Sequence, residues 1–154
     1  MAVLEDIRKL LDYNKVVYKC WTHPDCGTSE EGASVRGTPL MAGAKALVFR
    51  SEGAFAMLVI SGDKQVDWSA LRRVLRTKSL SLATPEEAFQ ITGCRIGSIP
   101  PFGNLFNIPV YVDKSLWRNE MIYFNAGRHD TSIGMNIDDW DRVVRPIRVS
   151  VAQG

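Results

Sequence analysis

The chain has 154 residues, of which 45% are hydrophobic and 23% charged, and its formal net charge is +2. This length fits one domain, and the composition excludes a disordered or fibrous protein. So small a net charge does not require a polyanionic partner, although it remains compatible with a local basic face.

The sequence has no apolar stretch that approaches the roughly 20 residues needed to cross a bilayer. Residues 1–15 have the pattern of an amphipathic helix rather than of a signal peptide. The three cysteines cannot all pair within one chain, which fits reduced thiols. We therefore expect a cytoplasmic protein without membrane contact.

The first half of the chain alternates predicted helices and strands. Apolar spacing predicts a helix that ends near Asn14 and then a strand over 16–21. Thr28 and Glu31 have capping-box spacing, so a short helix should follow and close near Gly37. Two apolar runs within 44–61, separated by Ser51-Glu52-Gly53, predict a hairpin.

The second half continues this mixture. A surface helix is predicted over 67–78, and Thr84, Pro85 and Gly93 mark the start and end of another. Strands follow over 108–113, 120–127 and 131–136, then a helix over 137–144 and a strand over 147–151. The pattern indicates a single α/β or α+β domain over residues 1–154.

The segment GCRIGSIPPFG, residues 93–103, is the most distinctive loop. Its glycines permit close approach to the backbone, while Pro100 and Pro101 fix the path of the chain. Backbone N–H groups could then form a cradle for a carbonyl oxygen or an anion, namely those of Gly97, Ser98, Ile99, Phe102 and Gly103. The alternative is a tight surface connection that binds nothing.

Several other residues have both a functional and a structural interpretation. Lys45 heads an apolar strand, where it either faces a pocket or remains solvated. His129, in a turn between strands, either reaches a site or is simply exposed. A basic stripe on the surface helix suits phosphates but also fits a solvated face; its residues are Arg72, Arg73, Arg76 and Lys78.

Metal and thiol chemistry are further alternatives. Cys20, His23 and Cys26 have the spacing C-x2-H-x2-C, but a structural zinc needs a fourth ligand and Cys94 lies far along the chain. A thiol nucleophile, Cys94 or Cys26 with His23 or His129, requires a proximity that sequence does not show. We predict no metal and no cofactor. The aspartates at 138, 139 and 141 fit the first turn of the last helix.

Three segments in order, GAKALVF, GSIPPFG and NAGRHDTSIGM, resemble the YbaK / prolyl-tRNA-synthetase-associated editing-domain family over nearly the whole chain. The matched features are Lys45 at the strand head, the loop from Gly97 to Gly103, and Ala126 to Ile133. The resemblance implies a central mixed sheet or partly closed barrel flanked by helices. It also implies hydrolysis of a mischarged aminoacyl-tRNA by a free-standing domain acting in trans.

On this resemblance Lys45 is the principal catalytic residue. The basic stripe, whose charge suits phosphates, is the expected tRNA contact. The expected substrate contacts are Gly97, Ser98, Ile99, Pro100 and Gly103, with Gly127, His129 and Ser132 as a supporting wall. Some relatives have aspartate where this chain has Ser132, which leaves the edited amino acid open; alanine, serine and threonine are the candidates.

The expected partners are the aminoacylated end of tRNA and an aminoacyl-tRNA synthetase, with the protein a monomer or homodimer. Two other functions remain open at this point. One is a noncatalytic module that binds tRNA ends or aminoacyl-adenylate analogues and regulates a synthetase. The other is a zinc-dependent or thiol hydrolase of small molecules.

Overall fold

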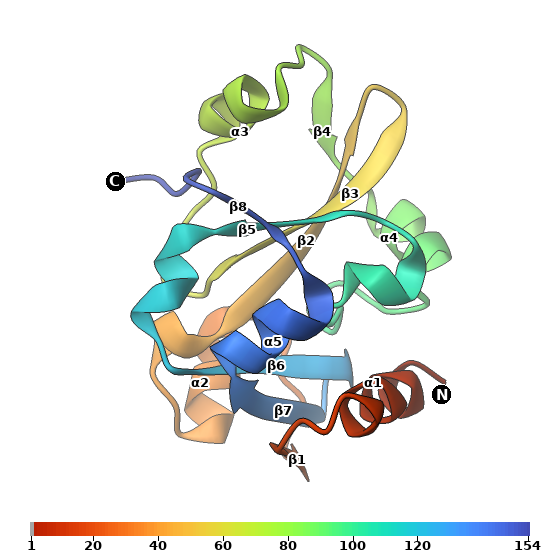
Figure 1. The fold of residues 1–154 in the computed structure, drawn as a ribbon, viewed down its shortest axis with the longest axis vertical. Helices are drawn as coiled ribbons and strands as arrows, with labels where there is room; N and C mark the ends of the chain where they lie inside the picture. The colour runs from red at the N-terminus through yellow and green to blue at the C-terminus, as the bar shows by residue number, and fades with distance from the viewer. Residues whose placement is uncertain (1) are drawn as a thin grey trace.

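The computed structural model describes residues 2–154, which combine five α-helices with two β-sheets (Figure 1). The helices are α1 (Ala2–Tyr13), α2 (Ser29–Arg36), α3 (Trp68–Leu75), α4 (Pro85–Thr92) and α5 (Ile137–Val144). The strands are β1 (Tyr18–Thr22), β2 (Ala44–Ser51), β3 (Ala54–Ser61), β4 (Leu80–Leu82), β5 (Val110–Asp113), β6 (Met121–Arg128), β7 (Thr131–Asn136) and β8 (Ile147–Val149). The predicted mixed α/β class is confirmed.

The predicted caps form the helix ends. Thr28 caps α2 by accepting a hydrogen bond from the Glu31 N–H, and Gly37 ends the helix in the left-handed region at φ 68°. Thr84 and Glu87 form a complete capping box at the start of α4. Such short helices depend on these caps, because an eight-residue segment is marginal on its own.

The strands divide into two sheets instead of one central sheet, and neither sheet is a closed barrel. One has the order β1-β7-β6 and is antiparallel; the other has the order β4-β2-β3-β5-β8. In the five-stranded sheet β3-β5 and β5-β8 are parallel, and the remaining pairs are antiparallel. A backbone bridge between Gly43 and Tyr123 joins the two sheets.

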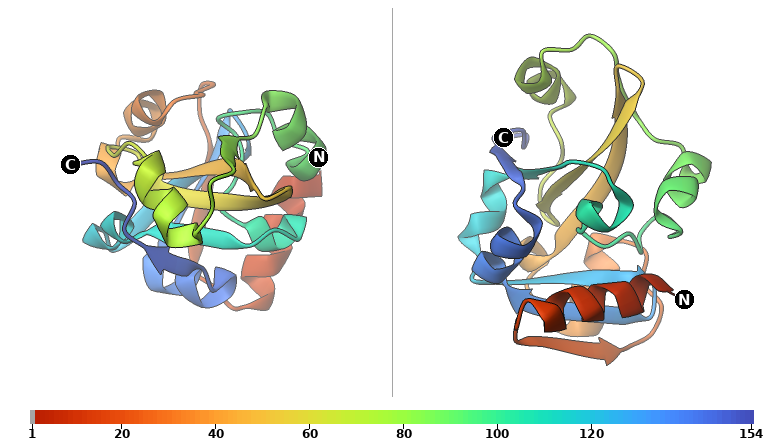
Figure 2. Two further views of the ribbon diagram at one scale, coloured as in Figure 1. Left: turned by 90° about the horizontal axis from the view of Figure 1, so that it is seen from above. Right: turned by 45° about the vertical axis from the view of Figure 1, so that its right-hand side comes forward.

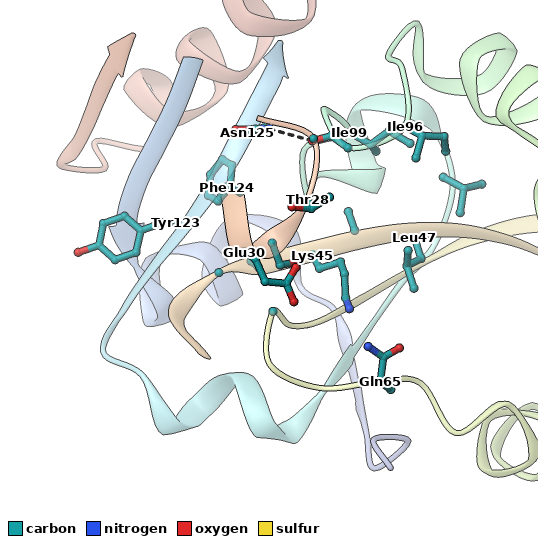
Figure 3. Close-up of a pocket in the computed structure, with 18 of the residues that line it drawn as sticks. Thr28, Glu30, Lys45, Leu47, Gln65, Ile96, Ile99, Tyr123, Phe124 and Asn125 are labelled. Carbon is teal, nitrogen blue, oxygen red and sulfur yellow. Dashed lines mark hydrogen bonds between the residues drawn. The ribbon is translucent and has the colours of Figure 1, made fainter. Parts of the chain in front are cut away.

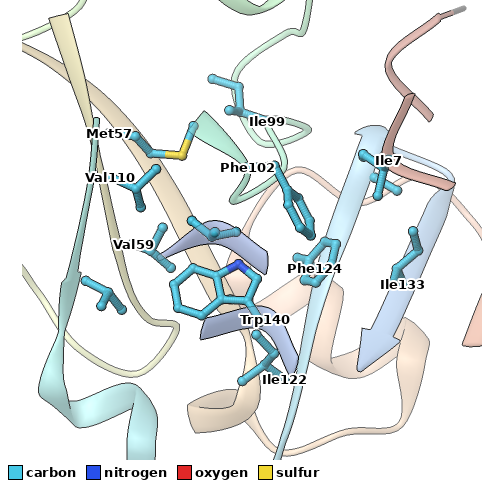
Figure 4. Packing of buried hydrophobic residues seen from close by; sticks show 14 of the residues in the cluster. Ile7, Met57, Val59, Ile99, Phe102, Val110, Ile122, Phe124, Ile133 and Trp140 are labelled. Carbon is cyan, nitrogen blue, oxygen red and sulfur yellow. The ribbon is translucent and has the colours of Figure 1, made fainter. Parts of the chain in front are cut away.

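The main hydrophobic core lies between the sheets (Figure 4). Phe124 of β6 packs edge-on against Phe102 at a centroid distance of 5.4 Å, and Trp140 of α5 is fully buried beside them. A second cluster, which includes Phe49, Leu58 and Leu71, lies under α3. The views in Figure 2 show α1 lying along the three-stranded sheet, where it packs against β6.

The glycine- and proline-rich loop is anchored in this core. Ile99 and Phe102 are buried, and the Trp140 indole N–H donates to the Pro101 carbonyl at 2.9 Å. The Phe102 N–H bonds the Pro100 carbonyl, and the Ser98 N–H bonds the Arg95 carbonyl. Because residues 98–103 are buried, the exposed residues of the loop are Gly93 and the stretch from Arg95 to Gly97.

None of the helices within residues 2–154 is both long enough and apolar enough to cross a membrane.

Candidate active site

A cavity of about 330 Å³ opens between the two sheets (Figure 3). One wall is the start of β2, which contributes Lys45 and Leu47, and the opposite wall is β6. The first residues of α2 and the loop residues Ile96, Gly97 and Ile99 also line it. A cavity of this size is at the small end of the range for ligand sites, so it suits a small molecule fragment.

Lys45 places a half-buried ammonium group in this cavity. Its Nζ donates to the Lys64 carbonyl at 3.0 Å, so the side chain is held by the backbone of the neighbouring loop. Burial lowers the pKa of Lys45 below its ordinary value, and the negative charges of Glu30 and Asp63 oppose that change. Glu30 itself lines the cavity, so a cation and an anion face the same space.

The loop contributes backbone donors. Of the residues that the structure describes, none accepts a hydrogen bond from the N–H groups of Gly97 and Ile99, and both residues line the cavity. Gly97 has φ +88°, and a Cβ at this position would collide with the carbonyl oxygen of Gly27. Only glycine fits here without strain, and the two free N–H groups suit a developing oxyanion.

Asn125 of β6 holds the loop in place from the other sheet. Its Nδ2 donates to the Gly97 carbonyl at 2.8 Å and to the Cys26 carbonyl at 3.0 Å. Its Oδ1 accepts from Arg36 Nη2 at 3.2 Å. Because Asn125 is buried and its amide is fully engaged, it acts as a scaffold for Gly97.

Arg36, at the end of α2, is a cation without a carboxylate partner among residues 2–154. Its Nε donates to Ser132 Oγ at 2.8 Å, and burial lowers the pKa of the guanidinium. Gly32 leaves room for Arg36 to fold back, since a Cβ there would meet the guanidinium at 2.9 Å. Arg36 lines the cavity, whereas Ser132 lies behind it.

The structure therefore separates the predicted substrate contacts into two groups. Lys45, Gly97 and Ile99 line the cavity together. The others, which do not line it, are Ser98, Pro100, Gly103, Gly127, His129 and Ser132. Ser98, Pro100 and Gly103 are buried anchors of the loop, and the N–H of Ser98 is already bonded.

The residues of the predicted supporting wall, Gly127, His129 and Ser132, hydrogen-bond to the loop and to Arg36. The Gly127 N–H donates to the Ser98 carbonyl, and His129 Nε2 donates to the Ile96 carbonyl at 2.9 Å. Ser132 is fully buried, and its Oγ lies 2.7 Å from His23 Nε2 as well as beside Arg36. These residues hold the loop and Arg36 from behind, so a carboxylate at position 132 would face the arginine rather than a bound substrate.

The basic stripe also lies outside the cavity. Arg72 and Arg73 are on α3, Arg76 follows it in the left-handed conformation at φ 54°, and Lys78 comes two residues later. Only Arg72 and Arg73 belong to α3, which covers the second core cluster, and Arg76 and Lys78 lie in the segment after it. Its predicted contact with tRNA remains a prediction.

The cysteine-based alternatives do not assemble in the described part of the chain. No three side chains of His, Cys, Asp or Glu within residues 2–154 are grouped so that they could hold a metal ion. Cys26 and Cys94 are buried thiols outside the cavity lining, and burial raises the pKa of Cys94. A raised pKa disfavours the thiolate that a nucleophile needs.

Sequence reasoning missed Thr28, Glu30, Arg36 and Asn125 as cavity residues. Thr28 was identified only as a helix cap, yet the same cap places the start of α2 at the cavity. A helix N-terminus favours negative charge nearby, which adds to the effect of Lys45. Asn125 gave no signal apart from being a polar residue within an apolar strand.

Comparison with known proteins gives the family. Residues 23–143 match the model of the aminoacyl-tRNA editing domain, so the chain belongs to that family. A relative of similar length is the multifunctional Ser/Thr-tRNA deacylase ProXp-y of Escherichia coli strain K12. It is 34% identical over 142 residues, which cover 89% of this chain and 85% of the relative.

Larger enzymes and solved structures show the same likeness. The proline–tRNA ligase of Caldicellulosiruptor bescii is 27% identical over 118 residues, which are 76% of this chain and 20% of that enzyme. A crystal structure described as that of a proposed trans-editing enzyme for prolyl-tRNA synthetase superposes with a TM-score of 0.87. It is 22% identical and covers 100% of this chain and 99% of its own, which shows a shared fold.

Proposed function

We propose that this protein is a trans-editing deacylase that hydrolyses the ester of a tRNA mischarged with a small or hydroxylated amino acid. One observation carries the proposal: in a chain of the aminoacyl-tRNA editing family, the Lys45 ammonium and the free N–H groups of Gly97 and Ile99 border one small cavity. An aminoacyl ester is already activated, so positioning and charge stabilisation can suffice for its hydrolysis.

The proposed reaction is attack of water on the ester carbonyl carbon. The carbonyl oxygen becomes an oxyanion, which the N–H groups of Gly97 and Ile99 stabilise while Lys45 supplies positive charge. The bond to the ribose oxygen then breaks, and that oxygen takes up a proton. The products are the free amino acid and the uncharged tRNA.

The small cavity and the relative that acts on Ser/Thr-tRNA favour serine and threonine over larger amino acids. The Glu30 carboxylate lines the cavity and would attract the substrate's α-amino group. Every aminoacyl ester carries this α-amino group, so the contact would hold the substrate, and the size of the cavity would select the side chain. We expect the protein to act in the cytoplasm on tRNA charged by a synthetase, as a monomer or homodimer.

The test is a panel of tRNAs charged with serine, threonine, alanine and a larger amino acid such as leucine. The wild type should release serine and threonine fastest, and Lys45→Ala should lower kcat/KM roughly 100-fold, as expected for loss of a group that stabilises the transition state. Lys114→Ala, an exposed lysine outside the cavity, is the charge-matched control. Saturable binding of these tRNAs without turnover would instead indicate a noncatalytic module.

A further inference from the structure

A second hollow adjoins the cavity where the loop meets α4. It is lined by Pro85, Glu86, Phe89, Gln90, Arg95 and Ile96. Ile96 lines both hollows, so they lie next to each other at this residue. Three large apolar side chains that line the two hollows are exposed, and we call them the apolar shelf: Leu82 at 54%, Phe89 at 51% and Ile96 at 53%.

The charges around the apolar shelf are unequal. Arg95 is exposed, and its guanidinium forms no ion pair or hydrogen bond with any residue in the range 2–154. Glu86, in the first turn of α4, is the acidic residue of the same hollow. A negatively charged ligand group is therefore drawn to the Arg95 side and repelled from the Glu86 side.

The substrate of the proposed function dictates what lies at the mouth of the cavity. Its ester is attached to the ribose of the terminal nucleoside, so the base of that nucleoside lies one sugar away from the reacting carbonyl. Unpaired bases bind to proteins by stacking on aromatic side chains beside a cation that contacts the phosphate. The apolar shelf with Arg95 offers both elements next to the cavity.

We propose that the apolar shelf binds the terminal adenine of tRNA, which stacks on Phe89 and Ile96, while Arg95 contacts the phosphate on its 5′ side. This inference rests on the proposed function, because the ester in the cavity fixes where the base lies. Hydrogen bonds fix the backbone positions of Ile96 and of the helix that carries Phe89. The His129 ring donates to the Ile96 carbonyl at 2.9 Å, and the capping box of Thr84 and Glu87 secures the helix that carries Phe89.

The decisive measurement is the affinity for an uncharged RNA hairpin that ends in unpaired CCA. Phe89→Ala should weaken Kd about tenfold, within the range found for loss of one stacked base, and Phe89→Trp should retain or improve it. Tyr13→Ala, which removes an exposed aromatic ring on α1, is the matched control and should leave Kd unchanged. Because Phe89 is half-exposed, its replacement should not prevent folding.

A hairpin whose terminal nucleotide lacks its base completes the test. The wild type should bind this abasic RNA as weakly as Phe89→Ala binds the normal RNA, and Phe89→Ala should lose nothing further. The proposal is overturned if Phe89→Ala binds normal RNA within twofold of the wild type, if the wild type does not bind it, or if the abasic RNA binds equally well.

A failure of the deacylase proposal gives a different experimental result from a failure of the binding proposal. This binding assay contains no ester, so it judges the apolar shelf whether or not the protein is a hydrolase. In a parallel assay, a seryl ester of a simple alcohol should be hydrolysed equally by the wild type and Phe89→Ala, while charged tRNA distinguishes them. A wild type that hydrolyses neither substrate contradicts the deacylase proposal but leaves the binding result to stand.

Discussion

At the scale of single residues, Lys45 combines partial burial with a charge that the proposed reaction needs. Because burial lowers its pKa, the ammonium loses its proton at a lower pH than an exposed lysine does. The group is charged below that pKa and neutral above it. We therefore expect kcat/KM to fall at alkaline pH, starting before the range in which ordinary lysines titrate.

This pH dependence is measured as a profile of kcat/KM for wild type and Lys45→Arg. The arginine stays charged throughout, so its alkaline decline should move to higher pH even if its overall rate is lower. Superimposable profiles for the two proteins would mean that Lys45 is not the group that titrates.

Asn125 is a second residue with a measurable effect. In Asn125→Ala the Gly97 and Cys26 carbonyls lose their donor, and we expect the free energy of unfolding to fall by about 1–3 kcal/mol. Deacylation should fall as well, because Gly97 is no longer held against β6. Urea denaturation and the rate assay check both effects, and Asn104→Ala, an exposed asparagine without a side-chain hydrogen bond among the described residues, is the control.

Residues that line the cavity could be predicted from sequence where their local chemistry is unusual. The lysine at a strand head and the glycine in a proline-rich loop are visible as local patterns, so Lys45 and Gly97 could be identified. Arg36 could not, because an arginine in the last turn of a helix is equally explained by the helix dipole. Its burial depends on Gly32 and Ser132, which only the folded chain brings to it.

At the scale of elements, the loop before Ile99 depends on Gly97 for two separate reasons. Gly97→Ala would place a side chain in the left-handed region and would also force its Cβ against the Gly27 backbone. Gly37→Ala has a similar φ of +68° but no atom within 4 Å of its Cβ, so it isolates the cost of the conformation. That cost is about 1 kcal/mol.

We therefore expect Gly97→Ala to lower the free energy of unfolding by more than Gly37→Ala does, and to reduce deacylation where Gly37→Ala does not. Thermal unfolding and the rate assay separate the two variants. Equal losses of stability, with activity kept in both, would show that the loop tolerates displacement from Gly27.

The elements themselves were largely predictable, because caps and periodicity are local. Helices begin after Thr28 and Thr84 and end at Gly37 and Gly93, as expected. The short strand β4 was not predicted, since Leu80–Leu82 is too brief to show a period of two. The division into two sheets was also not predictable, because a strand's own pattern does not specify its neighbours.

At the scale of the whole molecule, the basic stripe on α3 can be tested through salt. If these side chains contact phosphates, Arg73→Gln/Arg76→Gln should weaken RNA binding and reduce the slope of log K against log salt by up to about 0.7–0.9 for each lost contact. Arg8→Gln/Lys9→Gln on α1 removes the same charge elsewhere and serves as the control. Equal slopes for both double variants would mean that the basic stripe faces solvent and does not contact phosphates.

Apart from the single bridge between Gly43 and Tyr123, the two sheets that flank the cavity form separate hydrogen-bond ladders, and the aromatic pair Phe102–Phe124 packs between them. The width of the cavity is therefore the distance between the two sheets. Buried side chains that do not contact the ester set this distance through their volume. Replacement of one of these buried aromatic residues by a smaller residue would change the width of the cavity. Lys45 and the N–H groups of Gly97 and Ile99 would remain in place. Relatives that share these reactive groups can therefore differ in which amino acid they remove from tRNA.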